Sequence, residues 1–172
     1  MSILLIDAGN TRIKWALARA ESFNLNDPWI KSGHFNHEQA NEDVRHHLIH
    51  EASSIKKIIC ASVINKKTIE QLKATLKKIC RTASWHDISG NSALSQVGTT
   101  YISPEKLGAD RRAMIIGAAE LFPKRNILII CTGTATTIDL LSSNKQHLGG
   151  LILPGIKLMS QSLHTGTAQL PD

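Results

Sequence analysis

The chain contains the same strand–turn–strand pattern twice, and this repetition constrains its fold more than any other feature. The stretch LLIDAGNTRIKWAL at residues 4–17 aligns without gaps with LIICTGTATTIDLL at 128–141. In this alignment Gly9 falls on Gly133, Asn10 on Thr134 and Asp7 on Cys131. Each copy has an apolar run, a glycine turn and a second apolar run, which is typical of a β-hairpin. We therefore expect an internally duplicated α/β protein with one hairpin in each half.

The remaining elements follow from hydrophobic periodicity and from turn residues. The Gly9–Asn10 dipeptide suits a turn with positive φ. Residues 90–109 are rich in Gly, Ser and Thr and predict a long loop between lobes or at an active site. The pattern predicts strands at 2–8, 12–18, 56–63, 82–89 and 147–155 and in both halves of 125–141, and helices at 37–50, 65–80, 110–122 and 156–168.

Composition predicts a globular protein of one domain or two small lobes. Of the 172 residues 42% are apolar, and 20 basic against 14 acidic residues give a net charge of +6. The basic residues are scattered, so the charge suits anionic small molecules as well as nucleic acid. The three cysteines, Cys60, Cys80 and Cys131, lie in or beside apolar runs without metal-binding spacing. We expect reduced core thiols, no leader or membrane span, and a soluble cytoplasmic protein.

The first glycine turn is flanked by a carboxylate and a lysine. Backbone N–H groups of such turns form anion-binding concavities, and glycine lets a phosphate approach closely. Asp7, at the end of an apolar strand, is either a residue that fixes the turn or a ligand that holds Mg²⁺ through water. Lys14 is either a solvated edge residue or a phosphate ligand. The P-loop pattern is absent, so we expect polyphosphate to bind to hairpin turns.

A second group of polar residues follows the long loop, in YISPEKLGADRR. Asp110 is either a helix N-cap or a general base for a substrate hydroxyl. Arg111 or Arg112 would then bind an anionic group of the substrate. In CTGTATTID, Asp139 is either catalytic or, as we expect, ends a strand on a solvated face. His46 and His50 have the spacing of a metal-binding pair on a helix, but without an acidic third ligand we expect surface residues.

Together these motifs resemble the type III pantothenate kinases, the Bvg accessory factor family. The resemblance rests on four ordered motifs along nearly the whole chain: Asp7 to Thr11 with Lys14, Tyr101 to Pro104 followed by Leu107 to Arg111, Gly133 to Ala135, and Gly149 to Gly155. It implies a duplicated actin-like, ribonuclease-H-like fold, with a lobe at residues 1–103 and a partial lobe at 104–172. The implied reaction transfers the ATP γ-phosphoryl group to the 4′-hydroxyl of pantothenate, the first step of coenzyme A synthesis.

The resemblance also assigns roles residue by residue. Asp110 is the expected catalytic base, and Asp7 the expected Mg²⁺ ligand through water. A homodimer is expected, as in the family. The residues implied to bind ATP are Asp7, Ala8, Gly9, Asn10, Thr11, Arg12, Ile13, Lys14 and Thr134, and those implied to bind pantothenate are Tyr101, Gly108, Ala109, Asp110 and Arg111.

Two departures from the family pattern stand out. Cys131 replaces an aspartate that commonly helps to hold K⁺ or NH₄⁺, and a soft thiol suits such an ion poorly, so backbone carbonyls would have to serve. Family members also continue past GTAQLP with elements that supply a substrate-binding threonine and part of the adenine pocket. The second lobe is therefore expected to be incomplete.

Three alternatives remain open from the sequence. In the first, the chain is a non-catalytic nucleotide-binding or regulatory relative, an alternative that the short length and Cys131 favour. In the second, it is another actin-like kinase or phosphatase that acts on a different hydroxyl compound, and Tyr101 and the Gly108–Arg111 run argue against this. In the third, it binds nucleic acid, which only the net charge supports.

Overall fold

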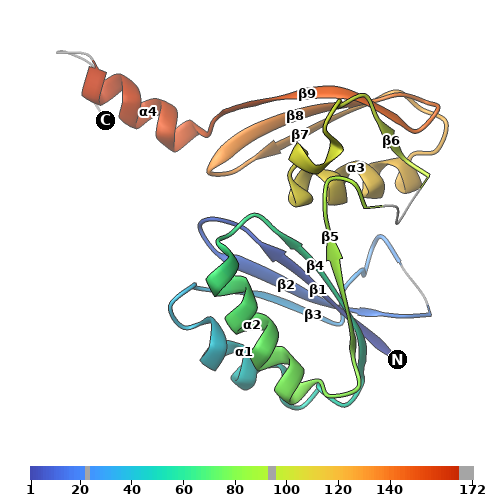
Figure 1. The fold of residues 1–172 in the computed structure, drawn as a ribbon, viewed down its shortest axis with the longest axis vertical. Helices are drawn as coiled ribbons and strands as arrows, with labels where there is room; N and C mark the ends of the chain where they lie inside the picture. Colours follow the sequence, from blue (N-terminus) through green and yellow to red (C-terminus); the bar gives the residue numbers. More distant parts are fainter. Residues whose placement is uncertain (22–23, 93–95, 167–172) are drawn as a thin grey trace. The chain divides into compact units, whose positions relative to one another are not determined.

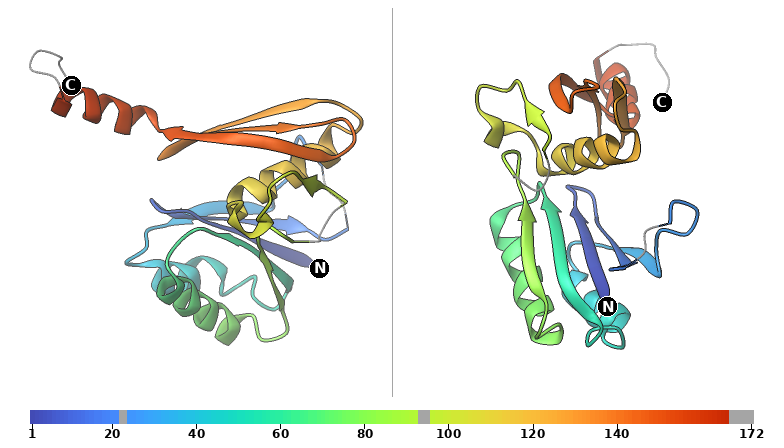
Figure 2. Two further views of the ribbon diagram at one scale, coloured as in Figure 1. Left: turned by 45° about the horizontal axis from the view of Figure 1, so that its top comes forward. Right: turned by 90° about the vertical axis from the view of Figure 1, so that its right-hand side faces the viewer.

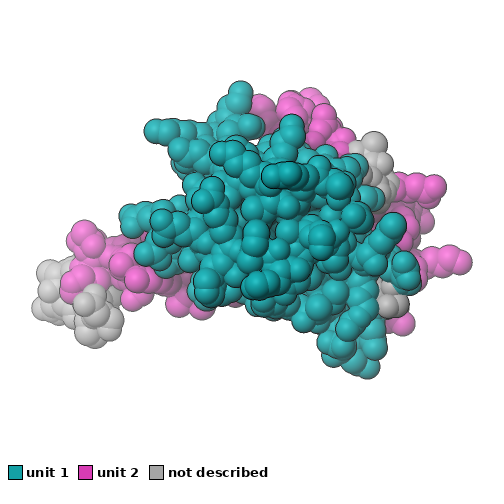
Figure 3. Space-filling view, turned by 90° about the horizontal axis from the view of Figure 1, so that it is seen from below, with its two compact units in different colours: residues 1–88 teal, residues 89–172 magenta. Residues whose placement is uncertain are grey.

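A computed structural model describes residues 1–21, 24–92 and 96–166. The chain packs as two compact units, Met1–Ile88 and Ser89–Asp172, coloured separately in Figure 3. The packing of this chain divides after Ile88. The boundary between lobes of the family fold that the sequence places after residue 103 stays a prediction.

Unit 1 is a five-stranded mixed sheet whose strand order is β3-β2-β1-β4-β5 (Figure 1). β1, β2 and β3 form an antiparallel meander, while β4 and β5 run parallel to β1. The helices α1 and α2 lie side by side in both Figure 1 and Figure 2. The elements are β1 (Ser2–Ala8), β2 (Ile13–Arg19), β3 (Lys31–Phe35), α1 (Ala40–Leu48), β4 (Ile55–Ser62), α2 (Lys66–Ile79) and β5 (Ser84–Ile88).

The core of unit 1 is predominantly apolar. Alternate residues of β1 and β2 are buried, as expected for strands with one face on the core. Trp15 stacks on Phe35 with ring centroids 5.7 Å apart. The predicted apolar face of α2 is confirmed, because Leu72 and Leu76 are buried and Ile69 and Ile79 pack against the same cluster.

Unit 2 contains a four-stranded sheet whose order is β6-β9-β8-β7. β7, β8 and β9 form an antiparallel meander, as β1, β2 and β3 do in unit 1, so the predicted duplication is confirmed at the level of topology. The elements are β6 (Gly98–Thr99), the 3₁₀ turn Pro104–Lys106, α3 (Ala109–Leu121), β7 (Ile127–Thr132), β8 (Ala135–Leu141), β9 (Gln146–Pro154) and α4 (Ile156–Gly166).

The two faces of the unit 2 sheet differ. On one face α3 packs against β7 and β8 and buries Leu107, Ile115, Ala119 and Leu141. Elsewhere apolar side chains are exposed, on β7, β9 and α4. No residue of α4 within its described range is buried, and the helix continues from the end of β9 away from the sheet (Figures 1 and 2). The helix expected at 156–168 is confirmed to Gly166, and its last two residues lie outside the described residues.

Several sequence-based expectations need correction. Strands β3 and β6 were missed because each is short and without alternation. The expectation of positive φ at the Gly9–Asn10 turn is wrong, because among the described residues only Lys124, Lys145 and Gly149 have positive φ. Of the cysteines expected in the core, Cys60 and Cys80 are buried but Cys131 is exposed. His46 and His50 are exposed, as predicted. Within the described ranges no helix has the length and apolar character needed to cross a membrane.

The three thiols should react at very different rates. Burial raises the pKa of Cys60 to about 12 and that of Cys80 to about 11, so both stay protonated at neutral pH. We expect a thiol-reactive probe at pH 7.5 to label Cys131 rapidly and the other two only after unfolding. Peptide mapping by mass spectrometry reads this out. Rapid labelling of Cys60 in the folded chain would contradict the buried placement of β4.

Candidate active site

The first glycine turn joins β1 to β2 through four residues, Gly9 to Arg12. The Gly9 N–H donates to the carbonyl oxygen of Arg12 over 3.2 Å, which closes the turn. His37 Nε2 lies 3.1 Å from the carbonyl oxygen of Asn10 and braces the loop from outside. Ala8 and Ile13 anchor its two ends in the core, whereas the side chains of Asn10, Thr11 and Arg12 are exposed.

Asp7 and Lys14 are direct cross-strand neighbours at this turn. The two residues pair in the β1–β2 register, and Lys14 Nζ lies 3.0 Å from Asp7 Oδ2. Both side chains are well exposed, at 42% for Asp7 and 59% for Lys14, so their mutual attraction is weakened by water. A carboxylate and an ammonium thus sit together beside exposed turn residues, an arrangement open to a polyphosphate with its cation.

The second glycine turn is shorter and is supported from behind. The Gly133 N–H donates to the carbonyl oxygen of Ala135 over 2.9 Å, and the Gly155 N–H donates to that of Thr134 over 3.0 Å. A Cβ on Gly155 would collide with the backbone oxygens of Gly133 and Thr134. The Pro154–Gly155 pair therefore packs directly on the turn, which explains why the motif of Gly149 to Gly155 accompanies Gly133 to Ala135 in the sequence.

Asp110 lies in the first turn of α3. Gly108 is the N-cap and makes no side-chain cap, so the alternative of Asp110 as the N-cap is wrong. Instead, Asp110 Oδ1 accepts the backbone N–H of Arg111 over 2.7 Å. The positive end of the helix dipole favours an ionised carboxylate there. The side chain is only partly buried, which leaves it within reach of a ligand.

Arg111 is held in a buried cluster of five residues, which we call the Asp139 cluster. Its Nε and Nη2 donate to the two oxygens of Asp139 over 3.0 and 2.6 Å, a bidentate pair. Nη2 also donates to the hydroxyl of Tyr101 over 3.2 Å. The hydrogen bond to Asp139 raises the pKa of Arg111 above its ordinary value, although burial acts in the opposite direction. The cluster comprises Thr99, Tyr101, Arg111, Asp139 and His147.

The cluster forms a continuous chain of donors and acceptors through His147. His147 Nε2 lies 2.8 Å from Asp139 Oδ1, and its Nδ1 lies 3.0 Å from Thr99 Oγ1. The Tyr101 N–H donates to the same Thr99 oxygen over 3.2 Å. Both ring nitrogens of His147 thus have a hydrogen-bond partner, and so do both oxygens of Asp139. Buried polar groups of this kind are costly when they are left unpaired.

The structure therefore brings together part of the predicted site and adds residues that the sequence reasoning missed. Tyr101, Asp110 and Arg111 lie together in unit 2. Asp139 was expected on a solvated face but is fully buried in β8, so that expectation is wrong. His147 was not singled out at all. The sequence signal consisted of an Asp in one strand and a Gly-Gly pair in the next. It can be interpreted only once Asp139 is known to face Gly150 in the β8–β9 register.

The described residues contain no group of three or more His, Cys, Asp or Glu side chains placed to hold a metal ion. Cys131 is exposed on β7 and belongs to no such group among these residues.

A family model described as type III pantothenate kinase matches residues 3–172. The chain belongs to the type III pantothenate kinase family. A type III pantothenate kinase from Janthinobacterium sp. (strain Marseille) is 37% identical over 172 residues, and one from Burkholderia vietnamiensis is 39% identical over 171. Each match covers 98% of this chain but only 65% and 62% of the relative. The chain thus spans just under two thirds of the length of these type III pantothenate kinases.

Solved structures agree on the fold. The Ppx/GppA phosphatase of Aquifex aeolicus matches with a TM-score of 0.52 at 16% identity, covering 98% of this chain and 56% of that one. A second structure of the Aquifex aeolicus family member gives 0.51 at 13% identity, covering 95% and 54%. At such low identity the likeness concerns the fold alone, and it confirms the predicted α/β, duplicated actin-like fold.

Gly150 tests the Asp139 cluster because it faces Asp139 across the β8–β9 pair. A Cβ there would collide with the backbone oxygen of Ile138 and would lie 2.5 Å from both Arg111 Nη2 and Asp139 Oδ1, so Gly150→Ala must displace the β8–β9 backbone and the ion pair together. We expect a loss of about 3 kcal/mol in the free energy of unfolding, typical of a broken buried ion pair. Urea denaturation followed by circular dichroism measures this loss.

Gly117→Ala is the matched control, since a Cβ at Gly117 in α3 would meet no atom within 4 Å. That variant should keep or raise stability, by up to about 1 kcal/mol, because alanine favours the helix. Equal losses in the two variants would contradict the placement of the cluster.

Proposed function

We propose that this protein transfers the γ-phosphoryl group of ATP to the 4′-hydroxyl of pantothenate, the first step of coenzyme A synthesis. Family membership supports the reaction, and one structural observation carries it. Three residues that the family motifs assign to the substrate, Tyr101, Asp110 and Arg111, are joined by hydrogen bonds within unit 2. Phosphoryl transfer depends chiefly on positioning and on charge stabilisation, and this assembly supplies both around one carboxylate.

Asp110 is the proposed catalytic base. One of its oxygens accepts the Arg111 N–H, which fixes the orientation of the carboxylate. The other oxygen would accept the proton of the pantothenate hydroxyl as phosphoryl transfer proceeds. Tyr101, Gly108, Ala109 and Arg111 would surround the remainder of the substrate. Because Asp139 already offsets the charge of Arg111, we assign Arg111 a largely orienting role toward Tyr101 and Asp110.

The nucleotide is proposed to bind at the glycine turns. Asp7 through Lys14 would receive the phosphates of ATP at one turn, and Thr134 would contribute from the other. Exposed backbone and side chains at the first turn and the adjoining Asp7–Lys14 pair support this assignment. Mg²⁺, when bound with ATP, would offset phosphate charge, and Asp7 would reach it through water.

Three finer points belong to the same proposal. A monovalent cation, K⁺ or NH₄⁺, would need backbone carbonyls, because the exposed thiol of Cys131 is a poor ligand for it. The homodimer rests on the family resemblance. The cytoplasmic location rests on that resemblance together with the reduced thiols expected from the sequence.

Asp110→Asn separates the proposed base from nucleotide binding. The amide cannot take the hydroxyl proton, so pantothenate-dependent ADP release should fall at least about 10²-fold. ATP affinity, measured by fluorescence with a labelled nucleotide, should stay within about twofold. Asp27→Asn is the control, because the Asp27 side chain is 70% exposed and pairs with Arg19 only at 3.7 Å. Unchanged turnover in Asp110→Asn would remove Asp110 from the mechanism.

Lys14→Gln tests the phosphate assignment independently of the chemical step. Removal of the ammonium beside the first turn should weaken ATP binding about tenfold, and the effect should shrink as salt is raised. Lys67→Gln, an exposed lysine in α2, controls for the loss of one positive charge in unit 1. The same equilibrium titration reads out both variants. Equal affinities in the two would place the phosphates elsewhere.

A further inference from the structure

α3 carries two consecutive buried arginines, and they differ in their partners. Arg111 is paired with Asp139, whereas Arg112 has no carboxylate partner among the described residues. Arg112 Nη2 donates to the carbonyl oxygens of Ser92 and Val97 over 2.9 and 2.7 Å. Among the described residues, its Nε and Nη1 are buried and have no hydrogen-bond partner. A guanidinium that is 4% exposed and lacks a counter-charge among these residues is costly, which favours binding of an anionic group.

The pKa values of the two arginines are shifted in opposite directions, which agrees with this difference in partners. Hydrogen bonding to Asp139 raises the pKa of Arg111, while burial lowers that of Arg112. Burial lowers the pKa of Arg112 because apolar surroundings disfavour the charged form of the guanidinium.

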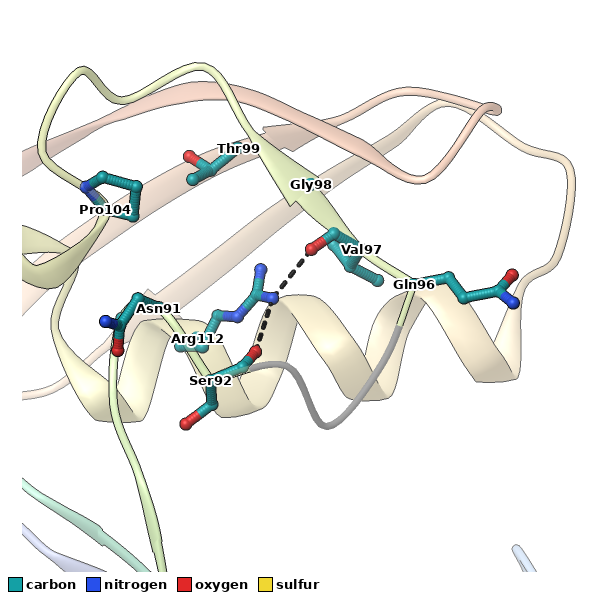
Figure 4. Close-up of a pocket in the computed structure, with 9 residues that line it drawn as sticks. Asn91, Ser92, Gln96, Val97, Gly98, Thr99, Pro104 and Arg112 are labelled. Atoms are coloured by element: carbon teal, nitrogen blue, oxygen red, sulfur yellow. Dashed lines mark hydrogen bonds between the residues drawn. The ribbon is translucent and has the colours of Figure 1, made fainter.

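Arg112 lines a pocket of about 450 Å³ that lies wholly within unit 2 (Figure 4). In Figure 4 the two dashed lines leave one terminal nitrogen, and the other terminal nitrogen turns toward the strand that carries Gly98 and Thr99. Apart from Arg112, the lining residues are uncharged, and they include the polar side chains of Asn91, Gln96 and Thr99. The pocket is shallow and open to solvent.

We propose that this pocket binds the carboxylate group of a small organic molecule, with Arg112 as its anchor. A single guanidinium among uncharged groups offsets one negative charge, which favours a carboxylate over a phosphate dianion. Neutral amide and hydroxyl groups from Asn91, Gln96 and Thr99 would contact the rest of the molecule. Arg112 is the one lining residue that the sequence offers as a ligand for the anionic group of the substrate, and carboxylate binding here can be tested without the phosphoryl-transfer reaction.

The carboxylate has two possible sources, which share this chemistry. One is pantothenate itself, which carries a carboxylate, and the other is a separate carboxylic acid that regulates the protein. Acetate is the minimal probe for the shared chemistry, and pantothenate added without ATP distinguishes the two sources.

The test uses the full chain labelled with ¹⁵N at arginine and follows the Nε–H signals at constant ionic strength. The signal that disappears in Arg112→Lys belongs to Arg112. We expect acetate to shift this signal saturably, and inorganic phosphate to shift it only at higher concentration. Absence of any shift with acetate and with pantothenate would overturn the proposal, as would phosphate binding more tightly than acetate.

Asn91→Asp keeps the test decisive without shortening the buried arginine. Asn91 Oδ1 accepts a hydrogen bond from Ser89 Oγ over 2.7 Å, and an aspartate can keep this bond. The negative charge of the aspartate would either pair with Arg112 or repel the carboxylate of the ligand. Acetate affinity should fall at least about tenfold. Asn126→Asp is the matched control, because Asn126 Oδ1 likewise accepts a hydrogen bond, from the Ser143 N–H, outside the pocket. Equal acetate affinity in Asn91→Asp and Asn126→Asp would contradict the proposal.

Discussion

The buried carboxylate of Asp139 is the interaction on which the geometry of unit 2 depends. A charge on a central strand with no exposure would be prohibitive alone, but Arg111 from α3 and His147 from β9 both bind it. Through Tyr101 and Thr99 the same group of hydrogen bonds ties the segment before α3 to the sheet. The start of α3, and with it Asp110, is thereby fixed relative to β8 and β9.

The two units share a strand topology, but different interactions stabilise their cores. In unit 1 the meander of β1, β2 and β3 packs on an apolar core, with Trp15 and Phe35 at its centre. In unit 2 the apolar cluster around Ile115 is smaller, and a polar cluster replaces part of it. Apolar packing tolerates changes in shape, whereas a bidentate ion pair fixes direction. The ion pair of unit 2 therefore fixes the orientation of Arg111 relative to β8 more strictly than apolar packing would.

Local sequence signals predicted much of this fold, and long-range pairing explains what they missed. The repeated hairpins, the apolar face of α2 and the start of α3 were all readable because periodicity and glycine positions are local. β3 was not, since its residues pair only through β2 and show no alternation of their own. Asp139 looked solvated because its partners, Arg111 and His147, come from other elements. That Arg112 has no carboxylate partner among the described residues likewise becomes evident only when the side chains around it are placed.

The central claim is that the chain phosphorylates pantothenate. The most direct measurement incubates the folded chain with ATP, Mg²⁺, K⁺ and pantothenate and identifies the product by mass spectrometry. The account predicts that 4′-phosphopantothenate accumulates in step with ADP and that neither forms from pantothenate without ATP. ADP release that is indifferent to pantothenate, with no phosphorylated pantothenate, would contradict it.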